Sequence, residues 1–129
     1  MRLNHVSNRI SLGTLDLMIE LMTSELNFRV LRRTATDVWL RQNDANVDIQ
    51  FCETDAPAAS GDKHNSHISF LSETPEAGLK HLADWFSQRG IRTVLGSWSN
   101  REFWLDAPEV FVDFTLESMT PDLAEYQTE

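Results

Sequence analysis

The pattern of apolar and polar positions changes period along the chain, and two stretches follow the period of a helix. Apolar residues recur at three- and four-residue spacing over residues 15–26, and Thr14 precedes them as an N-cap. The stretch of residues 75–88 follows Thr74 and has Pro75 at its first position. The pattern therefore predicts two amphipathic helices.

Shorter segments alternate between apolar and polar residues, or form brief apolar runs, which predicts strands. The alternation is clearest near the C-terminus, where Val110, Val112, Phe114 and Leu116 would share one face of a strand. The expected strands cover residues 3–10, 28–31, 37–40, 47–51, 66–71, 91–95, 102–105 and 109–117.

The order of one strand, one helix and three strands occurs twice, and short stretches of sequence repeat with it. Such a long period predicts two copies of one structural unit. The matching stretches are His5-Val6-Ser7 with His67-Ile68-Ser69, Asp37-Val38-Trp39-Leu40 with Glu102-Phe103-Trp104-Leu105, and Val47-Asp48-Ile49 with Val112-Asp113-Phe114. We expect one domain over residues 1–129, built of a unit 1–53, a linker 54–65, a unit 66–118 and a polar tail 119–129.

Composition and charge exclude several classes of protein. The 129 residues are 41% hydrophobic and 24% charged, which is typical of a globular domain and excludes a disordered chain. Eleven basic residues against 20 acidic ones give a net charge of −9, so we expect no nucleic-acid partner, because binding phosphates requires a basic face. The single cysteine, Cys52, excludes an intramolecular disulfide and favours a reducing, cytoplasmic compartment. Without a long apolar run or a signal sequence, we expect no membrane association.

Polar residues gather on the strand faces that lie opposite the apolar ones. If the first strands of the two halves orient likewise, His5 and His67 share these faces. The other residues are Asp48 and Gln50 in the first half and Asp113, Thr115 and Glu117 in the second. Such a face is either solvated or a site. Two imidazoles with one or two oxygen ligands suit a divalent Zn, Ni, Co, Mn or Fe ion.

The duplicated unit, with a histidine on each first strand, resembles the vicinal oxygen chelate superfamily, which includes glyoxalases, bleomycin-resistance proteins and extradiol dioxygenases. The resemblance covers residues 2–118. It rests on Leu3-Asn4-His5-Val6, Glu25-Leu26-Asn27-Phe28, Ser66-His67-Ile68-Ser69-Phe70, Arg89-Gly90-Ile91 and Phe103-Trp104-Leu105-Asp106-Ala107-Pro108. It implies an α+β fold in which two tandem βαβββ units form curved mixed sheets that enclose a cup-shaped site.

The resemblance also implies a divalent metal ion bound by the first and last strands of each unit. Its ligands would be His5, His67 and Asp113 together with Gln50, although the internal repeat favours Asp48 over Gln50. The superfamily prefers Glu at the position assigned to Asp113. The implied function is a glyoxalase-like, metal-dependent isomerase, lyase or thiol transferase. Two alternatives stay open: a non-catalytic small-molecule or drug-binding protein of the bleomycin-resistance kind, and an Fe(II) ring-cleaving dioxygenase.

Further residues are candidates for holding a small-molecule ligand. Tryptophans can stack on a ligand or pack in the core, and arginines can bind an anionic group or lie exposed. The candidates are Arg9, Trp39, Asp48, Trp98, Arg101 and Trp104. We also expect a homodimer, because the open edges of sheets need to be covered.

Overall fold

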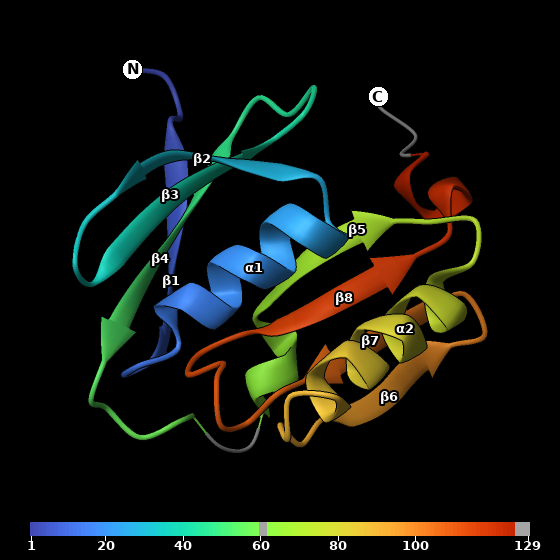
Figure 1. Cartoon of the computed structure of the whole chain (residues 1–129). Helices are drawn as coiled ribbons and strands as arrows, with labels where there is room; N and C mark the ends of the chain where they lie inside the picture. The colour runs from blue at the N-terminus through green and yellow to red at the C-terminus, as the bar shows by residue number, and fades with distance from the viewer. Residues whose placement is uncertain (60–61, 126–129) are drawn as a thin grey trace. The chain divides into compact units, whose positions relative to one another are not determined.

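The computed structural model describes residues 1–59 and 62–125 and divides the chain into two compact units, Met1–Ala58 and Ala59–Glu129 (Figure 1). Residues 60 and 61, which belong to the predicted linker, and residues 126–129, which belong to the predicted tail, lie outside the described residues. Each unit holds one helix and a four-stranded mixed sheet, as the tandem-unit prediction requires.

The first unit has the strand order β1-β4-β3-β2. Strand β1 runs parallel to β4, while β2–β3 and β3–β4 are antiparallel pairs. Its elements are β1 (His5–Ser11), α1 (Leu15–Glu25), β2 (Phe28–Arg33), β3 (Asp37–Gln42) and β4 (Asp48–Thr54).

Apolar burial on one side of the first sheet holds α1 in place. The helix buries Leu15, Met18, Leu21 and Met22, which repeat at helical spacing. The sheet buries Ile10, Val38, Leu40 and Phe51, which alternate along their strands. The opposite face of the sheet is therefore left to polar side chains, and we call it the open face of the first unit.

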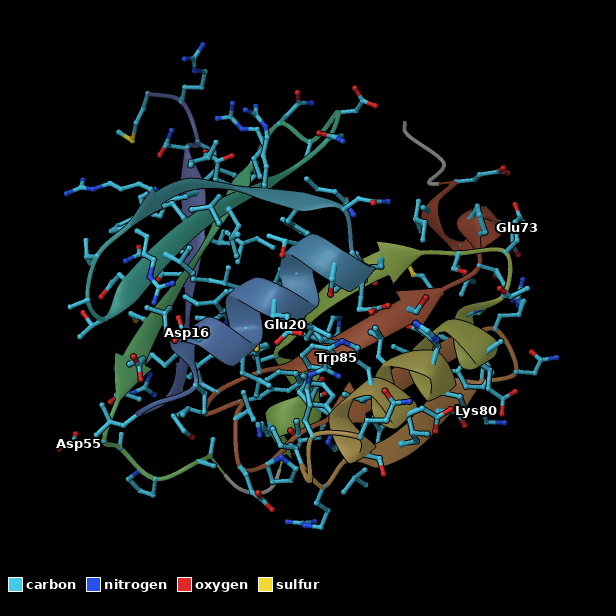
Figure 2. All side chains as sticks on the ribbon, viewed as in Figure 1. Asp16, Glu20, Asp55, Glu73, Lys80 and Trp85 are labelled. Atoms are coloured by element: carbon cyan, nitrogen blue, oxygen red, sulfur yellow. The ribbon has the colours of Figure 1, made fainter. Side chains whose placement is uncertain are left out.

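The second unit repeats this plan with the strand order β5-β8-β7-β6, and β5 is parallel to β8. Figure 1 shows α2 lying along one side of this sheet, over β7. Lys80 of α2 forms an ion pair with Glu76, whereas Trp85 of the same helix is buried. Figure 2 labels Lys80 and Trp85 on this helix. The elements are η1 (Asp62–Asn65), β5 (His67–Leu71), α2 (Pro75–Ser87), β6 (Val94–Ser99), β7 (Glu102–Asp106), β8 (Thr115–Met119) and η2 (Pro121–Ala124).

The last strand differs from its prediction. Strand β8 begins at Thr115, so residues 109–114 precede it instead of forming its first half. Val110, Phe111 and Val112 are all buried although they are consecutive. A strand cannot bury consecutive side chains on one face, so this stretch packs into the core as a loop. The alternating apolar residues before Thr115 therefore reflect packing of a loop in the core. In the alignment of the two units, Asp48 corresponds to Thr115, two residues after the predicted Asp113.

Strand β6 also begins later than predicted, at Val94. Gly90 adopts a positive φ of 73° after α2, and the backbone N–H of Ile91 donates to the carbonyl oxygen of Phe86. This is the usual way in which a glycine terminates a helix, and it delays the start of the strand. Within the described part of the chain, no helix is both long and apolar enough to cross a bilayer.

Candidate functional site

The open face of the second sheet brings a histidine and a buried glutamate together. His67 and Ser69 of β5 lie opposite Thr115 and Glu117 of β8, and Trp104 of β7 lies opposite Glu117 on its other side. Residues that pair across strands share a face, so these side chains form two neighbouring rows on one face. On the far face Leu105 and Leu116 are completely buried.

The contacts of Glu117 leave one oxygen without a donor. Its side chain is 3% exposed. The hydroxyl of Ser69 donates to Oε1 at 2.9 Å, whereas Oε2 is buried with no hydrogen-bond partner. The nearest basic group to Oε2 that we identify is Nε2 of His67, at 3.3 Å. A buried carboxylate oxygen without a donor is costly, so this atom is a position where a cation would be stabilised.

The tautomer of His67 strengthens this point. Its Nδ1 lies 3.0 Å from the backbone carbonyl oxygen of His64, which can only accept, so Nδ1 carries a proton. In the neutral ring Nε2 then holds a lone pair that faces the carboxylate of Glu117. Two lone pairs at 3.3 Å require a proton or a metal ion beside them.

A second carboxyl group, Glu102, adjoins Glu117. Partial burial raises the pKa of Glu102, and the nearby charge of Glu117 raises this pKa further. The charge of His67 acts in the opposite direction. Glu102 is thus a group that holds its proton to a higher pH than an exposed glutamate.

On the open face of the first unit, His5 and Gln50 occupy the positions that His67 and Glu117 occupy in the second unit. Ser7 and Gln50 are opposite each other as Ser69 and Glu117 are, and His5 lies opposite Asp48 as His67 lies opposite Thr115. The register therefore makes Gln50 the counterpart of Glu117. The internal match of Asp48 with Asp113 was wrong by two residues, because Asp113 lies in the loop before β8 and Thr115 takes the equivalent place.

Neighbouring side chains orient both residues of the first-unit pair. Nδ1 of His5 donates to Oδ1 of Asn4 at 2.8 Å, which leaves Nε2 with the lone pair. Nε2 of Gln50 donates to Oδ2 of Asp37 at 2.7 Å, which leaves its carbonyl oxygen available. Ligands that donate their second polar atom to a neighbour in this way are typical of metal sites.

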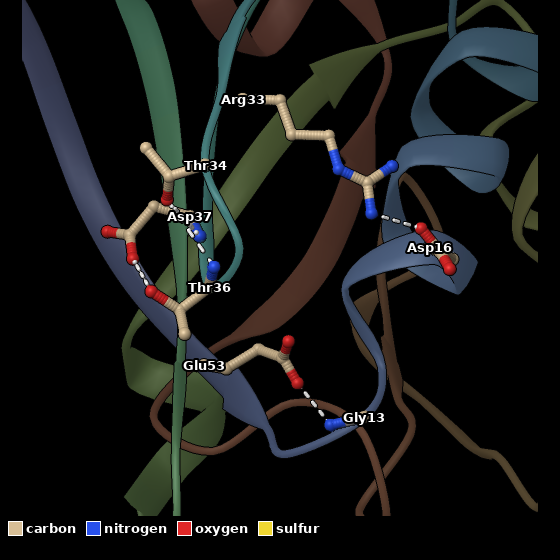
Figure 3. A network of polar contacts seen from close by, with 7 residues as sticks. All are labelled: Gly13, Asp16, Arg33, Thr34, Thr36, Asp37 and Glu53. Atoms are coloured by element: carbon tan, nitrogen blue, oxygen red, sulfur yellow. Dashed lines mark hydrogen bonds and ion pairs between the residues drawn. The ribbon is translucent and has the colours of Figure 1, made fainter.

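Asp37 is itself held in a polar network (Figure 3). The hydroxyl of Thr36 donates to Oδ1 of Asp37, and the backbone N–H of Asp37 donates to the hydroxyl of Thr34. Asp48, the alternative to Gln50, receives two hydrogen bonds from Arg41, from Nε at 2.6 Å and from Nη2 at 3.0 Å. Because Arg41 occupies both oxygens of Asp48, Gln50 is the more accessible oxygen donor.

The remaining predicted site residues are spread over both units. Arg9 lies opposite Cys52 on the first open face, and Trp39 lies beneath the guanidinium of Arg32 at 5.2 Å. The guanidinium of Arg101 forms an ion pair with Asp122, at the start of η2.

The other two tryptophans, Trp98 and Trp104, contact the ring of His64 at centroid distances of 5.0 and 5.2 Å. Gly96 accommodates Trp104, because a Cβ atom there would lie 2.1 Å from the indole ring.

A hollow of about 240 Å³ in the second unit adjoins these rings. Its lining includes Lys63, which sequence reasoning missed, and the buried Thr115, whose hydroxyl has no hydrogen-bond partner. Nζ of Lys63 donates to Oδ1 of Asp106 at 2.7 Å and to the carbonyl oxygen of Phe111 at 2.5 Å. The sequence placed Glu117 on the same polar face as Asp113, but it did not identify Glu117 as a candidate metal ligand.

No family model and no curated protein matches the chain. Several solved structures have a similar fold. Lactoylglutathione lyase from Agrobacterium tumefaciens has a TM-score of 0.56 and 10% identity, and the match covers 97% of each chain. A glyoxalase family protein from Enterococcus faecalis has a TM-score of 0.53 and 19% identity, over 92% of this chain and 96% of that one.

The fosfomycin resistance protein FosX from Mesorhizobium loti has a TM-score of 0.56 and 13% identity, over 97% of this chain and 94% of that one. At such identities the likeness concerns the fold. The chain therefore has the fold of the vicinal oxygen chelate superfamily, as its sequence predicted.

Proposed function

We propose that this protein is a metal-dependent enzyme that acts on a small molecule, of the isomerase, lyase or thiol transferase kind found with this fold. The observation that carries the proposal is the pair of His67 and Glu117. Oε2 of Glu117 is buried without a donor and faces a ring nitrogen that carries no proton in the neutral imidazole.

The spacing of this pair fits a metal ion. Ligand atoms about 2.1 Å from an ion such as zinc lie roughly 3.0–3.4 Å from each other, depending on the coordination geometry. The two atoms are 3.3 Å apart. Among the described residues no three His, Cys, Asp or Glu side chains gather at one point, so the pair needs ligands of another kind or from elsewhere.

His5 and Gln50 remain the ligands that we propose on the first unit, since each has its second polar atom engaged by a neighbour. We propose Glu117 in place of Asp113 because Glu117 lies in the strand register that Gln50 occupies in the other unit. A divalent ion bound by His67 and Glu117 would act as a Lewis acid that polarises an oxygen of the substrate. Ser69 and the carbonyl of His64 orient Glu117 and His67, and the pKa of the neighbouring Glu102 is raised by its partial burial.

Metal content tests the proposal. Protein purified without chelator should contain about one ion per chain by elemental mass spectrometry, and added Ni, Co, Mn, Zn or Fe(II) should raise the melting temperature. The variants His67→Ala and Glu117→Gln should lose the ion, while His81→Ala, which removes an exposed histidine of α2, should retain it. Wild-type stoichiometry in both site variants would contradict the assignment.

A second candidate function is small-molecule binding without chemistry. The hollow beside Trp104, with the exposed Trp98 close to His64, favours it. A protein of this kind would contain no stoichiometric metal, and its tryptophan fluorescence would change on binding a ligand. Substrate conversion that depends on an added divalent ion would exclude this alternative.

We propose further that the chain forms a homodimer. Strands β1 and β5 are end strands of their own sheets, and such edges are usually covered. Light scattering on the purified protein should give twice the chain mass of 14.8 kDa, and a monomer mass at micromolar concentration would contradict the dimer.

A further inference from the structure

The basic residues of the first unit are unusual in kind and in placement. All of them are arginines, Arg2, Arg9, Arg29, Arg32, Arg33 and Arg41. The strand register places Arg9, Arg29, Arg32 and Arg41 on the open face, where the strands contribute only Asp37 and Asp48 as acidic residues. A positive face on a chain of net charge −9 requires a physical reason.

Two of these arginines face each other directly. Arg29 of β2 and Arg41 of β3 are cross-strand partners in the antiparallel pair. Like charges in this position destabilise a sheet. Hydrogen bonds from Arg41 hold the pKa of Asp48 below its usual range, and the charges of His5 and Arg29 lower it further, so all of these groups are close together.

Asp48 does not neutralise both arginines. Its two oxygens accept from Nε and Nη2 of Arg41. Within the described residues no carboxylate forms an ion pair with the exposed guanidinium of Arg29. Arg41 donates one N–H from each of two nitrogens to Asp48, so three of its five N–H groups are not used in these two hydrogen bonds. This row therefore carries two guanidinium groups and one carboxylate.

A hollow of about 440 Å³ adjoins Arg41. Arg2, Asn4 and Asn46 also line it, and each can donate hydrogen bonds. Guanidinium groups bind carboxylate and phosphate oxygens two at a time, which makes arginine the preferred residue for such anions. The surrounding acidic chain disfavours an extended polyanion, so the hollow suits one small anionic group.

We infer that Arg2 and Arg41, which line the hollow, and Arg29, the cross-strand partner of Arg41, form a binding site for the anionic group, a carboxylate, phosphate or phosphonate, of a small-molecule ligand. The adjacent row across the sheet leads from Arg32 over Trp39 to Gln50. An anion bound by Arg29 and Arg41 would therefore lie one cross-strand row away from Gln50, a candidate metal ligand. As a statement about substrate class, the inference rests on the proposed enzyme function; as a binding site it does not.

Calorimetric titration of the chelator-treated full chain tests the site, with inorganic phosphate, methylphosphonate and acetate as separate probes at constant ionic strength. At least one probe should bind saturably at one site per chain. Arg29→Gln should weaken that binding about tenfold, the effect of one charge-assisted hydrogen bond. The order of the three probes identifies the preferred anion.

Arg33→Gln is the matched control. It removes the same charge from the same strand, but Arg33 lies on the other face and pairs with Asp16 of α1 (Figure 3). Equal weakening by both variants, or no binding of any probe, would overturn the inference. Because the titration uses metal-free protein, these outcomes are independent of the metal assay, which alone decides the proposed function.

Discussion

The two units share one backbone plan, yet their open faces have opposite chemical character. In the first unit the face carries arginines, and an amide, Gln50, is the third residue of β4. In the second unit the equivalent position is the buried carboxylate of Glu117, next to the second carboxyl group of Glu102. The helix-covered faces are apolar in both units. The comparison indicates that packing against the helix determines the fold, whereas the open face is free to specialise.

The tryptophans show the same divergence. Trp39 and Trp104 occupy equivalent places, each opposite the third residue of the last strand of its unit. Arg32 covers Trp39, and Trp104 instead lies against Gly96 and stacks on His64. Equivalent tryptophans thus make a cation–π contact in the first unit and join an aromatic cluster in the second.

The largest expected effect comes from the loop that only the second unit packs into its core. Phe111 is fully buried and stacks on Phe114 at 4.6 Å. Phe111→Ala should lower the free energy of unfolding by about 3–5 kcal/mol, measured by urea denaturation. Asn43→Ala, in the exposed loop before β4, should change it by less than about 0.5 kcal/mol. Similar losses for both variants would mean that the two loops do not differ as described.

Gly96→Ala should have the next largest effect, because its new Cβ would overlap the indole of Trp104. We expect a loss of about 1–3 kcal/mol and a shift of tryptophan emission as the ring is displaced. Gly78→Ala on α2, where no atom lies within 4 Å of the added carbon, should instead be neutral or stabilising. A fully stable Gly96→Ala with unchanged emission would refute this close contact.

Acid should affect the two units in opposite ways in chelator-treated protein. The lowered pKa of Asp48, caused first by its hydrogen bonds with Arg41, stabilises the fold above about pH 4, and this contribution is lost on further acidification. The raised pKa of Glu102 stabilises the fold at low pH and is lost as the pH rises above about 4.5.

Melting temperatures recorded as a function of pH check these signs. Asp48→Asn should flatten the decline in stability below pH 4, and Glu102→Gln should raise the melting temperature at pH 7. Profiles parallel to that of the wild type for both variants would contradict the two pKa directions.

The smallest effect is expected from Arg32→Ala. An exposed cation–π contact contributes about 0.5–1 kcal/mol, and the guanidinium lies 5.2 Å from the centre of the Trp39 ring. Arg89→Ala should cost more, because Arg89 lies 3.6 Å from the Trp85 ring and also donates to the Trp85 carbonyl oxygen. Thermal unfolding of both variants in parallel provides the comparison, and a larger loss for Arg32→Ala would reverse this ranking.

The sequence predicted the local elements better than the relations between them. Helix α1 was expected over residues 15–26 and covers Leu15–Glu25, because its apolar spacing and N-terminal residues both act locally. The start of β8 could not be predicted, because alternating apolar residues in a buried loop look like a strand. Because β8 was expected to begin too early, the predicted metal ligand on the last strand was Asp113, whereas Glu117 lies opposite Ser69 in the structure.

The same limit applies to the candidate site. His5 and His67 were identified from the repeat and Gln50 from the family resemblance, and the strand register places all three on open faces. Lys63, Arg29 and Glu102 were not identified, because what distinguishes them is a contact with a residue distant in the sequence. Register between strands supplies those contacts, and no single strand encodes its own register.

The parallel pairing of β1 with β4 and of β5 with β8 has a consequence for the order of folding. In each unit this pairing joins the first strand to the last, so its loop closure is the least local of the unit and should be slow. During synthesis the first unit can close before the second has left the ribosome. The arginine face would therefore be complete before the strand that carries Glu117 is made.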